Sequence, residues 1–322
     1  MQIGPYQTNN IYQGDCIEGM MNIPDGTIDL VIADPPYWKV IGEEWDYRWK
    51  TEEEYVDWSL KWIAEVARIL RLGGSFYCFG YFRTLALLIP HLEELGLELR
   101  QQIIINKGIK SVSGRKTSTY KMFPNVTESI LFIIKDNKKF LKPFLKGYQE
   151  KLKLTSKQIN ELLGVKSNGG GMWSIYTGKN ICEQFPTKKS WEKLSAILNF
   201  NLPYEKVSQT YNPQMGYTDV WDDIDFYEEE RYHPTQKPLS LINRLMIASS
   251  NKGDIVLDPF TGCGSTQLSA IQLEREYLGF EVDSDYFNTA LERINYATNP
   301  LAPKPKIRVK EKTNENKRKK RS

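Results

Sequence analysis

One short motif places a carboxylate, two prolines and a tyrosine directly after an apolar run. The motif is Asp34-Pro35-Pro36-Tyr37, and the run covers residues 28–33. A carboxylate at the carboxyl end of a buried strand lies in the crevice where α/β proteins bind ligands. Two prolines fix two φ angles and remove two amide donors, which leaves a rigid corner with free carbonyls. The Asp34 carboxylate and the Pro35 carbonyl can then accept two hydrogen bonds from one planar NH2 group; an ordinary strand-ending turn is the alternative.

A second motif has the composition of a ligand-binding turn. Residues 258–266 read Asp-Pro-Phe-Thr-Gly-Cys-Gly-Ser-Thr and follow another apolar run. Gly262 and Gly264 permit a tight turn and a close approach of a ligand to the backbone. About 20 residues later a strand-like run ends at Glu281, where an acidic residue can bind ribose hydroxyls. The GxGxxG pattern lacks its third glycine, but a glycine turn followed by an acidic strand end at this spacing indicates a nucleoside-containing ligand; no P-loop sequence occurs, so a P-loop nucleotidase is not supported.

The elements that must position these residues alternate between strand-like and helix-like runs. Short, nearly continuous apolar runs are typical of strands buried on both faces of a sheet. Thr51 and Glu54 have the spacing of a capping box, and Gly73 predicts the end of that helix. The alternation predicts an α/β fold with a doubly wound, mostly parallel sheet. We expect strands at 28–33, 75–79, 102–105, 129–134, 255–257 and 277–280, and further helices at 83–95, 239–250, 265–275 and 284–297.

The alternating pattern stops between about 137 and 230, and we interpret 137–230 as an insertion or a second small domain. A helix-sized piece at 155–164 can begin a helix-turn-helix. The alternative, which we favour, is a short amphipathic helix with Ile159, Leu162 and Leu163 facing a core.

Positive charge is concentrated in two regions of the chain. The formal net charge is +3, but residues 304–322 hold ten basic residues against two acidic ones, and residues 106–166 hold fourteen against four. Residues 219–230 hold seven acidic residues and no basic one. Aromatic residues interleave with the bases of the middle region, which indicates a polyanion-binding face; a solvated charge run is the alternative. The proline-rich, basic tail from about 300 is predicted to be disordered.

The composition argues against several classes of protein. Of 322 residues, 40% are hydrophobic and 26% are charged, as in ordinary globular proteins. No apolar run approaches about 18 residues, so we expect no membrane span, and no secretory signal is visible at the amino terminus. Four cysteines lie far apart and only two histidines occur, so we expect neither a disulfide framework nor a zinc site. These features predict a cytoplasmic protein with reduced cysteines and no metal.

The motifs together resemble those of the amino-methyltransferases of DNA, which use S-adenosylmethionine. Residues 34–37 match the catalytic motif DPPY of this family, and residues 258–266 match its cofactor loop. The segment His233-Pro-Thr-Gln-Lys-Pro238 resembles the one that precedes this loop, and Gly14-Asp15-Cys16 resembles the amino-terminal cofactor segment. The catalytic motif comes first and the cofactor loop last, which is the permuted order of the beta class.

This resemblance covers roughly residues 1–136 and 231–297 and implies a Rossmann-like methyltransferase fold. It implies four parts of the chain, namely a catalytic half (1–136), a target-recognition insertion (137–230), a cofactor-binding half (231–299) and the basic tail (300–322).

The resemblance implies how the first motif works. Asp34 and the Pro35 carbonyl bind the target amino group, Pro36 completes the corner, and Tyr37 stacks on the base. Two acceptors on the amino hydrogens favour a pyramidal nitrogen and stabilise the positive charge that grows during in-line transfer. A ring amine inside a duplex is out of reach, so the base must be flipped out. Aromatic residues after the motif can form a lid or second wall, or can pack on the following helix: Trp38, Trp45, Tyr47 and Trp49.

The resemblance also implies a set of residues that bind S-adenosylmethionine. Glu281 binds the ribose hydroxyls, and Asp15 meets the adenine edge with Cys16 as its neighbour. The remaining residues belong to the loop, to the helix after it and to the preceding segment: Asp258, Phe260, Gly262, Gly264, Ser265, Thr266 and Lys237. From the residues alone, Asp15 can instead be a turn residue and Lys237 an exposed charge.

The first letter of DPPY bears on the substrate. In this family Asp mostly accompanies adenine-N6 methylation, whereas cytosine-N4 enzymes more often carry Ser, so adenine is favoured and cytosine is the alternative. An RNA substrate stays open, while the related protein-glutamine enzymes have Asn-Pro-Pro-Tyr in the unpermuted order. A non-catalytic helix-turn-helix protein that senses a ligand is the alternative of another class; it predicts DNA binding without turnover.

Double-stranded DNA is the expected partner, and we expect no membrane partner. The family also allows a homodimer and a cognate restriction endonuclease. Sequence reading is assigned to residues 106–222, and the basic tail can add salt-dependent affinity. A loop of basic residues can hold phosphates, which position DNA without specifying its sequence: Lys107, Lys110, Arg115, Lys116 and Lys121.

Overall fold

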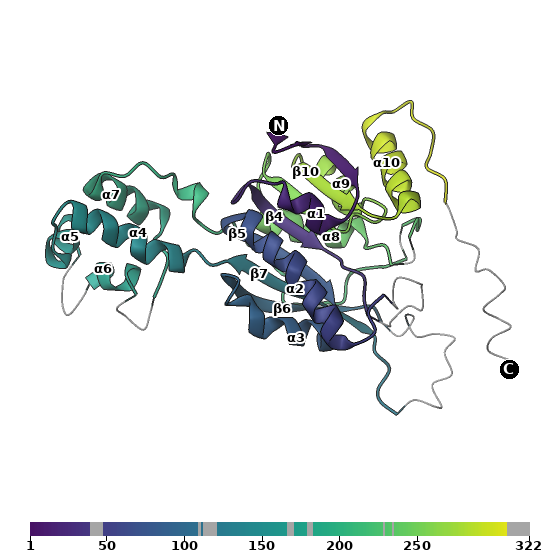
Figure 1. Ribbon diagram of the computed structural model, residues 1–322, viewed down its shortest axis with the longest axis horizontal. Coiled ribbons are helices and arrows are strands. Elements are labelled where there is room, and N and C mark those ends of the chain that lie inside the picture. The colour runs from purple at the N-terminus through teal and green to yellow at the C-terminus, as the bar shows by residue number, and fades with distance from the viewer. Residues whose placement is uncertain are drawn as a thin grey trace.

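The computed structural model describes residues 1–38, 48–108, 111, 121–165, 171–178, 183–227, 229–233 and 235–307, and in these residues an eight-stranded sheet forms the centre of the protein. The strands lie in the order β3-β10-β9-β4-β5-β7-β6-β8, and Figure 1 labels β10, β4, β5, β7 and β6 of this series. Their bounds, in this order, are Asn10–Gln13, Glu276–Glu281, Ile255–Asp258, Ile28–Ala33, Leu70–Gly80, Thr127–Lys135, Leu97–Asn106 and Val220–Trp221. A separate antiparallel pair is formed by β1 (Gln2–Ile3) and β2 (Tyr6–Gln7).

The direction of the strands decides which residues meet at each edge of the sheet. Among these eight strands β7 alone is antiparallel to its neighbours. Strands β4, β5, β9 and β10 therefore end at one edge, which we call the carboxyl edge. Ser129 of β7 is paired with Gly80 of β5, so the start of β7 lies at the carboxyl edge. The predicted strands are all present, whereas β3, β8 and the pair β1–β2 were not predicted because they are short.

Helices cover both faces of the sheet, as the doubly wound prediction requires. One core contains Val31 of β4 and side chains of α1 (Cys16–Met21), α2 (Glu52–Ile69) and α3 (Phe82–Leu92). The other contains Leu30 of β4 and side chains of α8 (Leu239–Ser249), α9 (Ser265–Gln272) and α10 (Ser284–Thr298). Successive strand residues point to opposite faces, which is why nearly continuous apolar runs fill both cores. The prediction of a doubly wound α/β fold is confirmed.

The residue that caps the start of α2 was predicted correctly, whereas the residue at which this helix ends was not. Thr51 Oγ1 accepts a hydrogen bond from the Glu54 amide at 3.2 Å, and the Glu54 carboxylate accepts one from the amide of Lys50, one residue before the cap. The helix ends at Ile69 and the chain enters β5 at once. Gly73 lies inside β5 with φ of +70°, where the sheet register shifts. A glycine is needed there because the backbone of another segment comes close.

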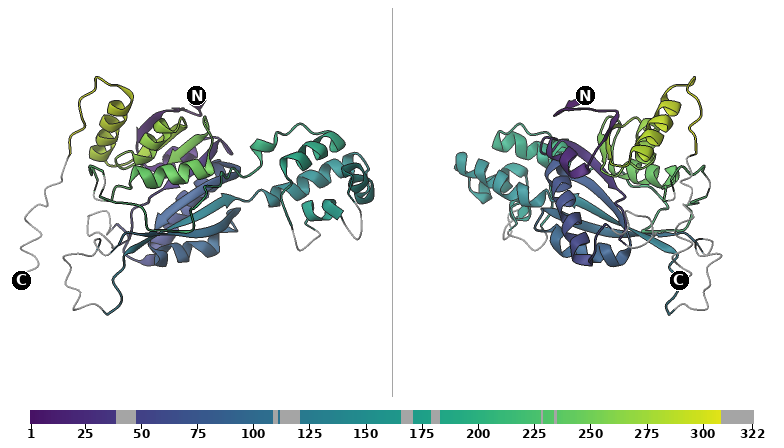
Figure 2. Two further views of the ribbon diagram at one scale, coloured as in Figure 1. Left: turned by 180° about the vertical axis from the view of Figure 1, so that it is seen from behind. Right: turned by 45° about the vertical axis from the view of Figure 1, so that its right-hand side comes forward.

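A group of helices forms a second body, which we call the helical lobe (residues 138–206). It contains α4 (Lys138–Lys151), α5 (Ser156–Leu163), α6 (Gly171–Tyr176), α7 (Lys188–Leu198) and a 3-10 turn at Tyr204–Lys206. It has a core of its own and stands to one side of the sheet (Figures 1 and 2). Because β7 is antiparallel, the lobe follows its end and lies beyond the edge opposite to the carboxyl edge.

The predicted insertion at 137–230 is thus divided by the structure. Residues after the lobe return along the sheet, add β8, and place Trp221 and Ile224 in the core of the sheet. The predicted helix within 155–164 is α5, which carries a complete capping box at Thr155 and ends at Gly164 with φ of +74°. Its Ile159 and Leu163 are buried in the core of the lobe, as the amphipathic-helix interpretation predicts, whereas Leu162 is exposed.

Three cysteines in the described residues, Cys16, Cys78 and Cys263, are buried and unpaired, and Cys182 lies outside the described residues. No helix in the described part of the chain is long and apolar enough to cross a membrane. The tail is described as far as residue 307, where Lys304 pairs with Glu230 at 2.6 Å; its basic end lies outside the described residues.

The close approach at Gly73 predicts the effect of one substitution. An alanine Cβ at this position would lie 2.6 Å from the carbonyl carbon of Ser208, and φ is positive. We expect Gly73→Ala to lower the free energy of unfolding in urea by roughly 2–4 kcal/mol, the sum of backbone strain and overpacking. Gly96→Ala is the matched control, because φ there is +73° but no atom lies within 4 Å of the new methyl group. Equal losses in the two variants would contradict the packing argument.

Candidate active site

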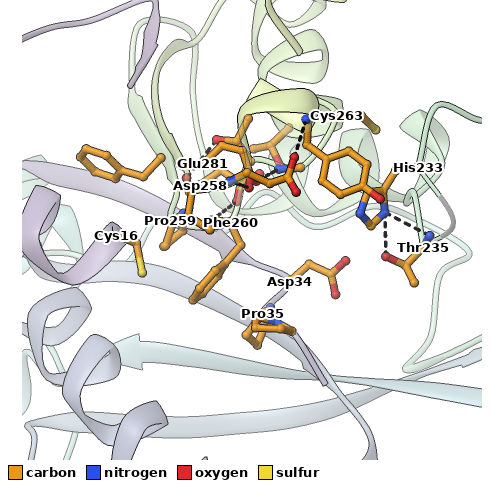
Figure 3. A pocket seen from close by; sticks show the side chains of 18 of the residues that line it. Cys16, Asp34, Pro35, His233, Thr235, Asp258, Pro259, Phe260, Cys263 and Glu281 are labelled. Carbon is orange, nitrogen blue, oxygen red and sulfur yellow. Dashed lines mark hydrogen bonds between the residues drawn. The ribbon is translucent and has the colours of Figure 1, made fainter. Parts of the chain in front are cut away.

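A cavity of about 260 Å³ lies at the carboxyl edge and brings the two motifs together. Figure 3 shows Asp34 and Pro35 on one side of this cavity and the loop of Asp258, Pro259 and Phe260 on the other. The catalytic and cofactor residues predicted from the sequence line it, with the exception of Gly264: Asp15, Cys16, Asp34, Pro35, Pro36, Tyr37, Lys237, Asp258, Phe260, Gly262, Ser265, Thr266 and Glu281. Segments that are far apart in the chain thus form one site.

The corner at the end of β4 is held in place by hydrogen bonds from tyrosines. The Tyr55 hydroxyl of α2 donates to the Pro36 carbonyl at 3.1 Å. The Tyr37 hydroxyl lies 2.9 Å from Asp34 Oδ1 and 2.6 Å from Glu128 Oε1, and its single proton can serve either carboxylate. Tyr37 is buried, and its ring meets Tyr81 edge-on. Its hydroxyl therefore belongs to a network of polar and charged groups at this corner, which also contains Asp34, Glu128 and Lys237.

Lys237 lies at the centre of that network. Its Nζ is 2.9 Å from Asp34 Oδ2 and 2.7 Å from Glu128 Oε1, and it also lies over the rings of Tyr37 and Phe79. Lys237 and Glu128 are each 6% exposed, whereas the Asp34 side chain is 25% exposed. The alternative of an exposed charge for Lys237 is wrong. The structure places it beside the catalytic motif.

In this network, burial and ion pairing shift the pKa values in opposite directions. Burial raises the pKa of Asp34, an effect that Lys237 opposes and Glu128 reinforces. Burial also raises the pKa of Glu128, but Lys237 and Lys107 together lower it to about 2. Burial lowers the pKa of Lys237, but the two carboxylates raise it above its ordinary value. Lys237 is therefore a cation and Glu128 an anion at neutral pH.

The glycine turn after β9 is closed by the carboxylate at the end of β10. Glu281 accepts hydrogen bonds from the amides of Gly262 at 2.7 Å and Asp283 at 2.8 Å. Each of its oxygens keeps a further lone pair for a ligand. Gly264 begins α9 with φ of +85°, and an added Cβ would lie 3.2 Å from the Cβ of Ala290. Its role here is the close packing of the turn on α10.

Asp15 and Cys16 enter the cavity from the start of α1. Asp15 is the N-cap of this helix, and its Oδ1 accepts from the amides of Ile17 at 2.8 Å and Glu18 at 3.4 Å. Burial raises the pKa of the Cys16 thiol well above its ordinary value, so it stays protonated. The turn-residue alternative for Asp15 thus describes its local role, while the side chain also lines the cavity.

Two interpretations were open for the aromatic residues after the motif: a wall of the pocket, or packing on the following helix. Trp49 packs against Trp58 of α2 with ring centroids 4.5 Å apart, and both rings line the cavity. The Trp38 indole donates to the Trp49 carbonyl at 3.0 Å. Packing on the helix and forming a wall are therefore both true of Trp49. Trp45 and Tyr47 lie outside the described residues.

Sequence reasoning missed some members of the site. Glu128 was counted only as one acidic residue of a basic region, although its place at the start of an apolar run was a signal of burial. His233 and Tyr286 also line the cavity, with ring centroids 4.1 Å apart, and the His233 Nδ1 accepts from the Thr235 amide. His233 lies in the quoted segment that precedes the loop, but no role was given to it.

Within the predicted phosphate-binding loop, only residues 107, 108, 111 and 121 are described. Lys107 points inward, 3.5 Å from Glu128, and is 25% exposed. Lys121 is exposed and is followed by exposed Met122 and Phe123. Three of the predicted residues lie outside the described residues: Lys110, Arg115 and Lys116. In the described part of the chain no group of three or more His, Cys, Asp or Glu side chains is arranged to hold a metal ion.

Asp258 gives a prediction for stability as a function of pH. Burial raises the pKa of this carboxyl from 3.8 to about 7, so the folded state holds a proton that the unfolded state releases. Its contribution to stability is present below pH 4 and is lost as the pH rises toward 7. We expect Asp258→Asn to match the wild type at pH 4 and to exceed its free energy of unfolding by roughly 2–4 kcal/mol at pH 8.

Denaturant titrations at both pH values check this, with Asp57→Asn on the exposed side of α2 as the control. A difference between Asp258→Asn and wild type that is the same at both pH values would contradict it.

Comparison with known proteins identifies relatives along most of the chain. A family model described as DNA methylase matches residues 28–292. The chain is 28% identical over 301 residues to the DNA adenine methyltransferase YhdJ of Escherichia coli (strain K12), covering 91% of this chain and 84% of that protein. It is 27% identical over 305 residues to the type II methyltransferase M.HinfI of Haemophilus influenzae, covering 89% and 68%.

Solved structures share the fold. TTHA0409 of Thermus thermophilus, in complex with S-adenosyl-L-methionine, has a TM-score of 0.54 at 23% identity and covers 92% of this chain and 96% of that one. The cytosine-N4-specific PvuII DNA methyltransferase has a TM-score of 0.56 at 16% identity and covers 92% and 93%. Since the family model spans most of the chain and both motifs, the protein belongs to the DNA methylase family.

Proposed function

We propose that this protein transfers the methyl group of S-adenosylmethionine to the exocyclic N6 amine of adenine in double-stranded DNA, on a base flipped out of the helix. The observation that carries the proposal is the Asp34 carboxylate, aimed into the same cavity as the glycine turn that Glu281 closes. Family membership supports the reaction class, and the names of YhdJ and M.HinfI support a modification enzyme of DNA.

The residues on the two sides of the cavity fit the two reactants. When bound, S-adenosylmethionine supplies a sulfonium methyl group, which leaves without help from a metal. Gly262 leaves room for a ligand beside the backbone, and Glu281 presents acceptor oxygens of the kind that ribose hydroxyls need. Phe260 and Trp58 add apolar surface. We assign cofactor binding to this side, with Asp15, Cys16 and the start of α9 as its other walls.

The opposite side activates the nucleophile. The lone pair of a ring amine is delocalised into the ring and is a poor nucleophile. Asp34 and the Pro35 carbonyl accept its two hydrogens, which favours a pyramidal nitrogen and stabilises the growing positive charge. The cavity holds the two reactants close together, which supplies the proximity contribution.

Adenine is favoured over cytosine on two grounds. The first residue of the motif is Asp, and the curated relative YhdJ is named as an adenine enzyme. The likeness to the cytosine-N4-specific PvuII enzyme concerns the fold. Cytosine N4 is the second candidate, because the same corner can accept either exocyclic amine.

One segment at the carboxyl edge is well placed to meet DNA beside the flipped base. It is the connection between β6 and β7, which includes Lys121, Met122 and Phe123; the segment after β8 starts at the same edge, but residues 219–230 hold seven acidic residues and no basic one. Phe123 is 95% exposed and Met122 is 80% exposed, next to a lysine, a combination suited to bases and phosphates. We therefore propose that contacts with DNA beside the flipped base are concentrated in this connection, while the helical lobe, beyond the opposite edge, remains only a predicted part of the recognition region.

An isotope assay tests the proposal. The protein is incubated with methyl-labelled S-adenosylmethionine and unmethylated genomic DNA, with RNA as a parallel substrate, and the nucleosides are analysed by mass spectrometry. We expect label in N6-methyladenine. Label in N4-methylcytosine would overturn the choice of base, label in RNA alone would overturn the substrate class, and the absence of label would favour the ligand-sensing alternative.

The role of Asp34 predicts a separation of binding from chemistry. Asp34→Ala removes the main acceptor for the amino group, so we expect the rate of methyl transfer to fall by roughly 10²–10³-fold or more while cofactor affinity stays nearly unchanged. Calorimetry and a single-turnover assay measure the two quantities. Loss of cofactor binding in this variant would show that Asp34 is assigned to the wrong ligand.

The role of Glu281 predicts the reverse pattern. Removal of a charged acceptor at a ribose should weaken cofactor binding by about 10–100-fold in Glu281→Ala. Glu276→Ala, at the other end of β10, is the control and should bind the cofactor as the wild type does. Unchanged affinity in Glu281→Ala would refute the ribose assignment.

The exposure of Phe123 predicts a contact with DNA. We expect Phe123→Ala to weaken binding of a target duplex by about 5–100-fold, the range for the loss of one aromatic stacking contact. Leu301→Ala is the matched control, because Leu301 is equally exposed, at 93%, but lies near the carboxyl terminus. A fluorescence anisotropy titration measures both, and equal affinities for the two variants would contradict the assignment.

A further inference from the structure

The carboxylate assigned to the target amino group already has a partner on each of its oxygens. Tyr37 donates to Asp34 Oδ1 at 2.9 Å, and Lys237 Nζ lies 2.9 Å from Asp34 Oδ2. The ammonium group thus stands at the carboxylate where an amine must bind. The resemblance assigns Lys237 to the cofactor, and neither that assignment nor the reaction described above gives it a task at Asp34.

A cation beside Asp34 has opposite effects before and during the reaction. Before a base enters, a buried carboxylate without a counter-ion is costly, so Lys237 stabilises the ionised form. During transfer, positive charge grows on the target nitrogen, and a lysine that remained on Asp34 would repel that charge and weaken the acceptor. The pocket therefore needs the cation while it is empty and needs it displaced when the base is bound.

Glu128 supplies the second position for the lysine. Its Oε1 is 2.7 Å from Lys237 Nζ, closer than Asp34 Oδ2, and Lys107 lies 3.5 Å from its other oxygen. Glu128 is 6% exposed and sits on β7, outside the corner that must receive the base. The Tyr37 hydroxyl lies between the two carboxylates and can turn its proton toward either one. A small rotation of the flexible lysine side chain would leave it on Glu128 alone.

We propose that Lys237 is a movable counter-ion, which is shared between Asp34 and Glu128 in the empty pocket and stays on Glu128 alone when the target amino group binds, and that Glu128 is the positioning residue that holds it. The inference deepens the proposed function and rests on it, because it assumes that the amino group binds to Asp34. It gives a task to two buried residues that the assigned chemistry does not use.

Lys237→Met tests the first half through its pH profile. The charged or titratable groups that face Asp34 are Lys237, Glu128 and Tyr37, with Cys78 of β5 and Asp258 of β9 farther off. Burial raises the pKa of Asp34 and Lys237 opposes this, so removal of the lysine should leave the carboxyl protonated at neutral pH. We expect kcat at pH 7 to fall by roughly tenfold or more and to recover as the pH rises to 9. A kcat that falls equally at every pH would overturn the counter-ion role.

Glu128→Gln and the double variant test the second half. When Glu128 is replaced by neutral Gln, Asp34 is the remaining one of the two carboxylates that Lys237 can pair with. We therefore expect kcat to fall by roughly tenfold or more at every pH, while the affinity for the cofactor stays unchanged. Removal of the lysine in the same variant should then restore part of the lost kcat. We expect the Glu128→Gln, Lys237→Met variant to exceed Glu128→Gln in kcat at pH 9. A double variant that is no faster than Glu128→Gln would overturn the movement of Lys237.

A matched ion pair elsewhere controls for the loss of charge. Lys138 lies 3.1 Å from Glu98 at the opposite edge of the same sheet. Lys138→Met and Glu98→Gln should leave kcat and the pH profile unchanged, and melting temperatures show whether any variant fails to fold.

A measurement without turnover separates this inference from the proposed function. Carboxyl-carbon NMR of the free protein, with Asp34 assigned through Asp34→Asn, follows the titration of this carboxyl. We expect it to titrate at a higher pH in Lys237→Met than in the wild type, and identical titrations would overturn the counter-ion role. If the wild type methylates no nucleic acid, the proposed function fails while this titration still decides the pairing of Lys237 with Asp34.

Discussion

Burial of a carboxylate favours its protonated form and a cation beside it favours its ionised form, and the site at the carboxyl edge of this protein is arranged around that balance. In the proposed reaction, Asp34 must be an anion to accept a hydrogen bond from the target amine. Lys237 and Glu128 provide the neighbouring charges, each from a different part of the chain. Tyr37 links the two carboxylates through one hydroxyl. The motif DPPY is therefore half of a site whose other half comes from β7 and from the segment before α8.

The topology of the sheet makes that arrangement available. Parallel strands β4, β9 and β10 end at one edge and bring together three acidic side chains: Asp34, Asp258 and Glu281. Each is stabilised differently, by an ion pair at Asp34, by a raised pKa at Asp258 and by two backbone amides at Glu281. Because β7 is antiparallel, its first residues lie at the same edge, and Glu128 lies next to Lys237. One reversed strand thus decides the charge balance of the site.

Local patterns predicted the elements well and their connections poorly. Apolar runs predicted the long strands and both faces of the sheet, because burial on two faces leaves a clear signal in composition. The direction of β7 left no such signal, since an apolar run looks the same in either direction. For that reason neither the place of Glu128 nor the position of the helical lobe beyond the opposite edge was foreseen. The end of α2 was predicted wrongly at Gly73 for a related reason. In the sequence alone, a glycine that permits a close backbone approach inside a strand looks the same as one that ends a helix.

The residues of the candidate site were predicted more completely than their partners. The resemblance assigned Asp34, Glu281 and the glycine turn, and the structure brings them to one cavity. It did not reveal that Lys237 faces Asp34, because that pair joins segments about 200 residues apart, nor that Asp15 caps the short helix α1, which was not predicted. The most direct test of the account is a crystal structure with an inert cofactor analogue and a duplex that contains a target adenine. The account predicts the adenine amino group within hydrogen-bond distance of both an Asp34 oxygen and the Pro35 carbonyl. An amino group bound elsewhere in the cavity would contradict it.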